Sequence, residues 1–143
     1  MGTNDDWLAL TTEETLEPDL PICDPHHHLW DTGYEPGVAF RAEQVANRYL
    51  LDEILADTSS GHNVVSTVFI ECASMYKSTG PEALRPVGET EFVNGIAAMS
   101  ASGQYGKTRV AAGIVGYSDL NLGSAVGEVL DAHIAAGCGR FRG

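Results

Sequence analysis

Residues 24–31 read Asp-Pro-His-His-His-Leu-Trp-Asp, and this stretch decides how the rest of the chain is interpreted. Together with the apolar residues before it, it favours a short strand over 22–29 that ends in a loop rich in Gly and Pro. Alternate side chains of a strand share one face, so Asp24, His26 and His28 are predicted to point the same way. Two imidazoles at positions i and i+2 can bind one divalent ion, and a nearby carboxylate can orient them.

Downstream of this strand, further strands are predicted to alternate with helices. The strands are expected near 64–71, 109–116 and 139–143. The helices are expected between Val45 and Ser59, over 92–103, and from an N-cap at Ser124 to a stop at Gly137. This order predicts an α/β fold with crossover units on a parallel sheet over 21–143, preceded by an acidic lead-in segment over 1–20.

Such a sheet can have either of two architectures. A (β/α)8 TIM barrel takes about 250 residues, so the 143 residues here would supply about three and a half of its units. The alternative is an open, doubly wound sheet. No G-x-G-x-x-G turn or P-loop follows any of the predicted strands, which disfavours the nucleotide-binding versions of that fold.

Composition excludes several classes of partner. The formal net charge of −12 argues against nucleic acid and against anionic membrane surfaces, because no basic stripe is present. The first basic residue is Arg41, and no apolar run approaches roughly 20 residues, so neither a signal peptide nor a membrane span is expected. The chain is therefore predicted to be soluble and cytoplasmic, without nucleic-acid or membrane partners.

Cysteines and the other histidines are assigned structural roles. Cys23, Cys72 and Cys138 are odd in number and lie in or beside apolar segments, which favours buried free thiols. His62 precedes a strand, at the end of a barrel where catalytic groups are not expected. His133 lies near a helix C-terminus, where the helix dipole would favour a partly protonated ring.

The strand segments carry a resemblance to a known enzyme family. Residues 24–31 are similar to the first-strand motif of the amidohydrolase-related branch of the amidohydrolase superfamily, whose hallmark is D-x-H-x-H. Residues 64–71, 109–116 and 139–143 resemble the second, third and fourth strands of that branch. The similarity covers most of the chain from Pro21 onward, and the first-strand motif is its specific part.

The resemblance implies the N-terminal portion of a TIM barrel whose mouth holds a divalent metal, with zinc the favoured ion. His26 and His28 would be metal ligands, and the parent protein would be a metal-assisted hydrolase of a small carbonyl substrate such as a lactone or a carboxylated ring compound. The branch also contains decarboxylases, and some lactonase relatives act without a metal. Metal-independent action and decarboxylation therefore stay open.

The same resemblance places the remaining histidines, and an aspartate that acts as the general base, on strands beyond residue 143. The isolated chain is therefore expected to be an inactive part of an enzyme. Its unpaired strand edges would also allow a homo-oligomer. The alternative is a self-contained, non-catalytic α/β module that binds a metal or a protein partner.

Three further residues are candidates for binding the substrate. Glu71 closes the second predicted strand, Tyr76 lies in the loop after it, and Arg142 lies in the fourth strand segment. A carboxylate and a hydroxyl can hydrogen-bond a substrate, and a guanidinium suits a carboxylate or lactone. The competing interpretations are a solvated strand end for Glu71, a polar loop for Tyr76 and a surface ion pair for Arg142.

Overall fold

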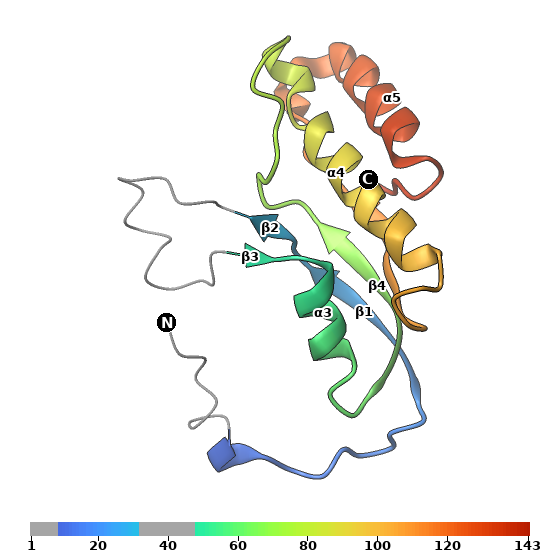
Figure 1. Cartoon of the computed structure of the whole chain (residues 1–143). Coiled ribbons are helices and arrows are strands. Elements are labelled where there is room, and N and C mark those ends of the chain that lie inside the picture. Colours follow the sequence, from blue (N-terminus) through green and yellow to red (C-terminus); the bar gives the residue numbers. More distant parts are fainter. Residues whose placement is uncertain (1–8, 32–47) are drawn as a thin grey trace.

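The computed structural model describes residues 9–31 and 48–143 (Figure 1). The strands are β1 (Pro21–His27), β2 (Trp30–Asp31), β3 (Arg48–Tyr49), β4 (Asn63–Ile70) and β5 (Arg109–Val115). The α-helices are α3 (Leu51–Thr58), α4 (Val87–Ala101) and α5 (Val126–Gly137), and short 3-10 turns lie at η1 (Ala9–Thr11), η2 (Glu82–Leu84) and η3 (Leu120–Ala125). None of the helices within these two described ranges has both the length and the apolar character needed to cross a membrane.

The main sheet is parallel and has the order β1-β4-β5. Residues 140–143 continue it beside β5: Phe141 forms a parallel bridge with Ile114, and the Arg142 amide donates to the Ile114 carbonyl at 2.8 Å. Neighbours in the sheet thus follow one another in sequence, with no reversal of order. The predicted α/β class with a parallel sheet is confirmed, whereas closure into a barrel stays a prediction.

The hydrophobic core lies between one face of this sheet and helices α3 and α4 (Figure 1). Its largest fully buried apolar side chains are Phe69, Leu29, Ile54, Ile114, Val93 and Val110. The other face of the central strand β4 carries Val64, Ser66, Val68 and Ile70, which are only half-buried. We call this the open face of the sheet.

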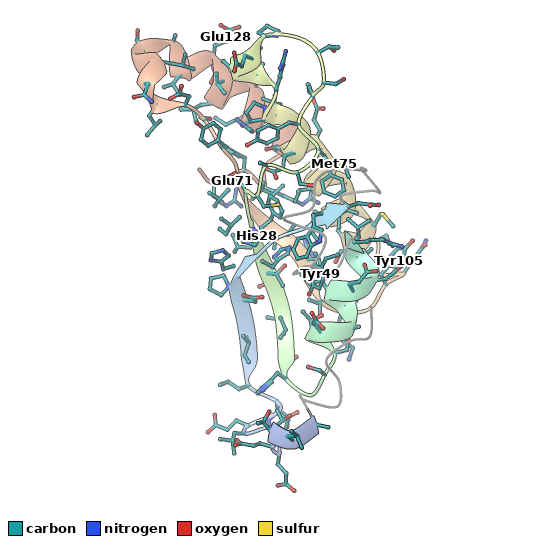
Figure 2. All side chains as sticks on the ribbon, turned by 90° about the vertical axis from the view of Figure 1, so that its left-hand side faces the viewer. His28, Tyr49, Glu71, Met75, Tyr105 and Glu128 are labelled. Atoms are coloured by element: carbon teal, nitrogen blue, oxygen red, sulfur yellow. The ribbon has the colours of Figure 1, made fainter. Side chains whose placement is uncertain are left out.

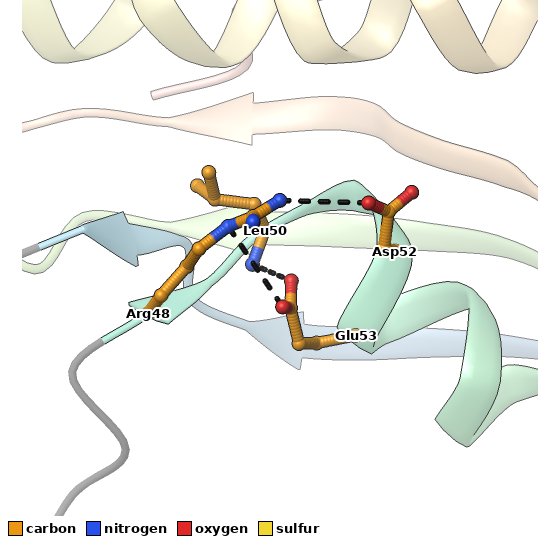
Figure 3. A network of polar contacts seen from close by, with 4 residues as sticks. All are labelled: Arg48, Leu50, Asp52 and Glu53. Carbon is orange, nitrogen blue, oxygen red and sulfur yellow. Dashed lines mark hydrogen bonds and ion pairs between the residues drawn. The ribbon is translucent and has the colours of Figure 1, made fainter.

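The first helix begins later than the apolar pattern predicts. Position Val45 lies outside the described residues, and Arg48–Tyr49 forms strand β3, which pairs antiparallel with β2. At the start of α3 the Glu53 carboxylate accepts a hydrogen bond from the Leu50 amide at 2.8 Å (Figure 3). This bond lowers the pKa of Glu53 and satisfies an amide that the first helical turn leaves unpaired.

The second and third helices also differ from the prediction. Helix α4 begins at Val87, five residues before the predicted start at residue 92, because its first turn contains Gly88 and Glu89, which an apolar periodicity does not count. Residues 120–125 form η3, so Ser124 is not the N-cap of α5. The left-handed residue that ends α5 is Cys138, with φ 46°, directly after Gly137.

Two of the three predicted buried thiols are exposed. Cys23 lies on the outer strand β1 and Cys138 at a helix end, and both are exposed to solvent. Cys72 is half-buried just beyond β4, and burial raises the pKa of its thiol to about 11. All three are free, as predicted. Apolar neighbours in the sequence do not ensure burial of a residue on an edge strand, such as Cys23, or at a helix end, such as Cys138.

His133 is fully buried, contrary to the predicted partly charged ring at a helix end. One ring nitrogen lies 2.8 Å from the Thr90 hydroxyl and the other 3.0 Å from the Tyr117 carbonyl, and the ring stacks on Phe141 at 5.0 Å. A carbonyl only accepts, so Nε2 carries a proton and donates to Tyr117. Burial lowers the pKa of His133, and the ring ties α5 to α4 and to the segment after β5.

His133 predicts a loss of stability in acid. Its native pKa lies below the ordinary 6.5, so the unfolded chain takes up the proton more readily, and the free energy of unfolding should fall as the pH drops below 6.5. Burial lowers the pKa of His27 to about 4, so this residue adds a second loss of stability between pH 6.5 and pH 4. Urea unfolding of the parent should show both losses between pH 7.5 and pH 5.

His133→Gln should be less stable than the parent by about 1–3 kcal/mol at pH 7.5, because the buried bonds are disturbed. Its stability should fall less than that of the parent on going to pH 5, since the contribution of His133 is removed and that of His27 remains. The exposed His62 supplies the matched control, and His62→Gln should keep the full pH dependence. An unchanged pH dependence in His133→Gln would contradict the assignment.

Candidate functional site

The candidate site lies where the parallel strands end. Because β1 and β4 run in the same direction, their carboxyl ends meet at one edge of the sheet, with His28 just beyond β1 and Glu71 just beyond β4. Figure 2 shows these two residues close together at that edge. Carboxyl ends of parallel strands are where α/β proteins bind their ligands.

Strand pairing decides which histidines face the core. His27 pairs with Phe69 and is only 7% exposed. Its ring packs edge-on against the Phe69 ring, with the centroids 5.8 Å apart, on the side of the sheet covered by the helices. Its two neighbours therefore point to the open face, as the alternation predicts. His26 is exposed there and His28 is half-buried.

The two outward-facing imidazoles converge. Nε2 of His26 lies 3.2 Å from Nε2 of His28, with the rings edge to face and their centroids 4.9 Å apart. Two nitrogens that bind one tetrahedral zinc at 2.0–2.1 Å are separated by about 3.3 Å. The spacing of the pair thus fits the nitrogen separation that a shared divalent ion requires.

The ring of His28 is also oriented by a hydrogen bond from its other nitrogen, Nδ1. Its Nδ1 lies 2.8 Å from the carbonyl oxygen of Ile70, at the end of β4. The carbonyl can only accept, so Nδ1 carries the proton and the lone pair of neutral His28 is on Nε2, facing His26. Metal-binding histidines are commonly oriented by such a bond from the other ring nitrogen.

Asp24 does not share a face with His26 and His28, contrary to the prediction. It pairs with Thr67, which is buried on the same side as Phe69, and the irregular register between Asp24 and His27 breaks the alternation. Across this irregularity, Oδ1 of Asp24 accepts a hydrogen bond from the His26 backbone amide at 3.1 Å. The carboxylate thus shapes the strand where His26 emerges. Among residues 9–31 and 48–143 no group of three His, Cys, Asp or Glu side chains is arranged to hold a metal ion.

The three predicted substrate-binding residues lie around this edge. Glu71 and Tyr76 are half-buried, and the pKa of the Tyr76 hydroxyl is raised by burial and by the negative charges of Glu89 and Glu71. Arg142 is exposed, and its Nη1 donates to the carbonyls of Gly139 and Phe141. Its guanidinium is therefore turned toward its own loop.

The side-chain stem of Arg142 nevertheless lies over the open face. A Cβ placed on Gly113 of β5 would lie 3.7 Å from Cγ of Arg142 and 3.5 Å from a methyl group of Val68. Val68 belongs to the open face, so the arginine stem shares that face with it. The absence of a side chain at Gly113 leaves room for both.

The sequence interpretation missed Glu89. This side chain is 1% exposed, and its Oε1 accepts hydrogen bonds from the backbone amides of Cys72 at 3.1 Å and Ser74 at 2.7 Å. The predicted helix begins only at Phe92, so the prediction leaves Glu89 outside it, whereas Glu89 lies in the first turn of α4. A glutamate directly after Val-Gly at a helix start is the only signal in the sequence, and it does not indicate burial.

The chain is similar to a protein of Sinorhizobium fredii named as the uncharacterized protein y4mH. The two are 35% identical over 126 residues, which cover 81% of this chain and 37% of the relative. The chain thus spans little more than a third of the length of the relative that it matches. Neither a family model nor a solved structure matches the chain.

Proposed function

We propose that the chain is the N-terminal part of a TIM-barrel hydrolase of the amidohydrolase-related branch, acting on a small lactone or carboxylated ring compound. The observation that carries the proposal is the His26–His28 pair, whose Nε2 atoms lie 3.2 Å apart at the carboxyl end of the first parallel strand. A nitrogen pair at this spacing suits a divalent ion, and this end of a parallel strand is where barrel enzymes bind substrate.

The order of the sheet supports the barrel. Strands β1, β4, β5 and the segment at Phe141 are neighbours in sequence order, as in a barrel, whereas a doubly wound sheet reverses its order at one point. The half-buried open face of β4 would then become the barrel interior. The relative extends far beyond the matched segment, and a barrel needs about 250 residues, so both fit a longer parent protein.

In the proposed site each residue has a separate task. His26 and His28 would hold the metal, and the Ile70 carbonyl would keep the His28 ring oriented. Glu71 and Tyr76 would contact the substrate from the loop after β4. When bound, a divalent metal polarises a carbonyl and lowers the pKa of a bound water towards about 7, which suits ester or amide hydrolysis near neutral pH.

The general base is expected on a strand beyond residue 143. The residues of the proposed site in this chain are therefore compatible with either hydrolysis or decarboxylation. The non-catalytic α/β module stays the alternative, and it would use the same histidines only to bind a metal or a protein partner. The folded state and the oligomeric state of purified residues 1–143 separate the two, since only the module predicts a stable monomer that needs no further strands.

Zinc affinity tests the histidine pair. The purified chain should bind zinc weakly, and His26→Ala or His28→Ala should each lower the affinity at least about tenfold, because one of two ligands is lost. Competition with a chromophoric chelator measures this. His62→Ala, which removes an exposed histidine away from the pair, should bind as the parent does. Equal binding by all four proteins would refute the ligand assignment.

A turnover assay tests whether catalysis needs residues on strands beyond residue 143. Residues 1–143 with added zinc should show no measurable hydrolysis of a panel of sugar lactones in a pH-indicator assay, because the proposed general base lies on a later strand. An intact lactonase of the amidohydrolase-related branch serves as the positive control. Turnover by residues 1–143 at a rate comparable to that of the intact lactonase would show that the site is complete without further strands.

A further inference from the structure

The buried carboxylate of Glu89 makes contacts that the proposed function does not use. Its Oε1 accepts from two backbone amides, those of Cys72 and Ser74, and lies 3.6 Å from the Cys72 sulfur. Its Oε2 is buried without a hydrogen-bond partner among the described residues. Burying a carboxyl group costs free energy, so its retention calls for a compensating role.

The loop that Glu89 holds has an unusual backbone. Ala73 and Met75 adopt left-handed conformations, with φ of 61° and 55°, although neither is glycine. The left-handed conformation is unfavourable for a residue with a Cβ, and it persists only where the surroundings hold it. The Ala73 conformation turns the amides on either side of it toward one carboxylate oxygen. Glu89 thus stabilises the backbone that follows Glu71.

Close packing presses the start of α4 against the same loop. A Cβ on Gly88 would lie 2.6 Å from the Met75 carbonyl oxygen and 2.9 Å from the Lys77 nitrogen, so only glycine fits there. The Lys77 amide also donates to the Arg85 carbonyl at 2.9 Å. The first turn of α4 therefore holds the loop through backbone contacts as well as through Glu89.

The two residues that follow β1 also contact the end of β4 and the start of the loop. The Cys72 thiol lies 3.5 Å from the Leu29 carbonyl, and His28 contacts the Ile70 carbonyl at 2.8 Å. Glu71 lies between these two contacts. The residues flanking it, Ile70 and Cys72, are thus held by His28 and Leu29, and Cys72 is held by Glu89 as well.

We propose that Glu89 is a positioning residue that holds the loop 72–76 so that Glu71 and Tyr76 face a ligand at the His26–His28 pair. This inference rests on the proposed function. Glu89 itself touches neither the histidines nor the ligand and acts through the backbone amides of Cys72 and Ser74. The acceptor oxygen of Glu89, rather than its charge, is the group that matters.

A double-mutant cycle on zinc affinity tests this inference. In the parent chain Glu71→Gln should weaken zinc binding about threefold to tenfold, because a carboxylate held near the ion attracts it. In a Glu89→Ala background, Glu71→Gln should have no further effect, since the loop no longer holds Glu71 in place. Hydrogen exchange should show in parallel that the Cys72 and Ser74 amides lose protection.

Conservative variants separate positioning from general stability. Glu89→Gln keeps an acceptor oxygen at the same reach and should preserve the effect of Glu71→Gln, whereas Glu89→Asp is one methylene too short and should lose it. Where Glu89→Ala fails to fold, these two variants carry the comparison. Glu91→Gln is the matched control, because Glu91 is exposed and contacts the same loop through Lys77 at 2.7 Å.

The outcomes are distinguishable. Loss of the Glu71 effect in Glu89→Asp but not in Glu89→Gln or Glu91→Gln supports the proposal. The proposal is overturned if Glu89→Gln behaves like Glu89→Asp, if every variant keeps the Glu71 effect, or if Glu71→Gln changes nothing in the parent. A parent chain whose zinc binding does not depend on His26 and His28 instead contradicts the proposed function itself.

Discussion

The pairing of His27 with Phe69 is the constraint on which the candidate site depends. It places one ring of the histidine run in the core and sends the two neighbouring rings to the open face. A slip of one residue in this register would exchange the faces, burying His26 and His28 and exposing His27. The apolar contact with Phe69 therefore selects which nitrogens can meet at 3.2 Å.

The end of β4 is held by polar contacts from two directions, and both satisfy backbone groups that strand pairing leaves free. His28 donates to the Ile70 carbonyl, and the Glu89 carboxylate accepts from the amides of Cys72 and Ser74. Unpaired backbone groups at a half-buried strand end would be costly. The side chains that remove this cost also fix Glu71 between them, so local stability and the geometry of the site have the same origin.

Much of the architecture follows from short-range patterns, and the departures have identifiable causes. The β-branched run in β4 and the alternation around His26 and His28 depend only on neighbours in sequence, so the strands and the facing of the histidines could be predicted. The start of α4 could not, because Gly88 and Glu89 are set by contact with a loop more than ten residues earlier. The burial of His133 likewise depends on Thr90 and Phe141, each distant in sequence or on another element.

The sequential order of the sheet narrows where a ligand can bind. An open sheet whose order reverses offers a crevice at the point of reversal, but β1, β4, β5 and the segment at Phe141 show no reversal. A site on such a sheet has to use the shared carboxyl edge and the face that the helices leave uncovered. The His26–His28 pair and the stem of Arg142 are both on that face, although they come from opposite ends of the chain. Groups so far apart in sequence share one face because each strand of the parallel sheet lies beside the strand that precedes it in this order.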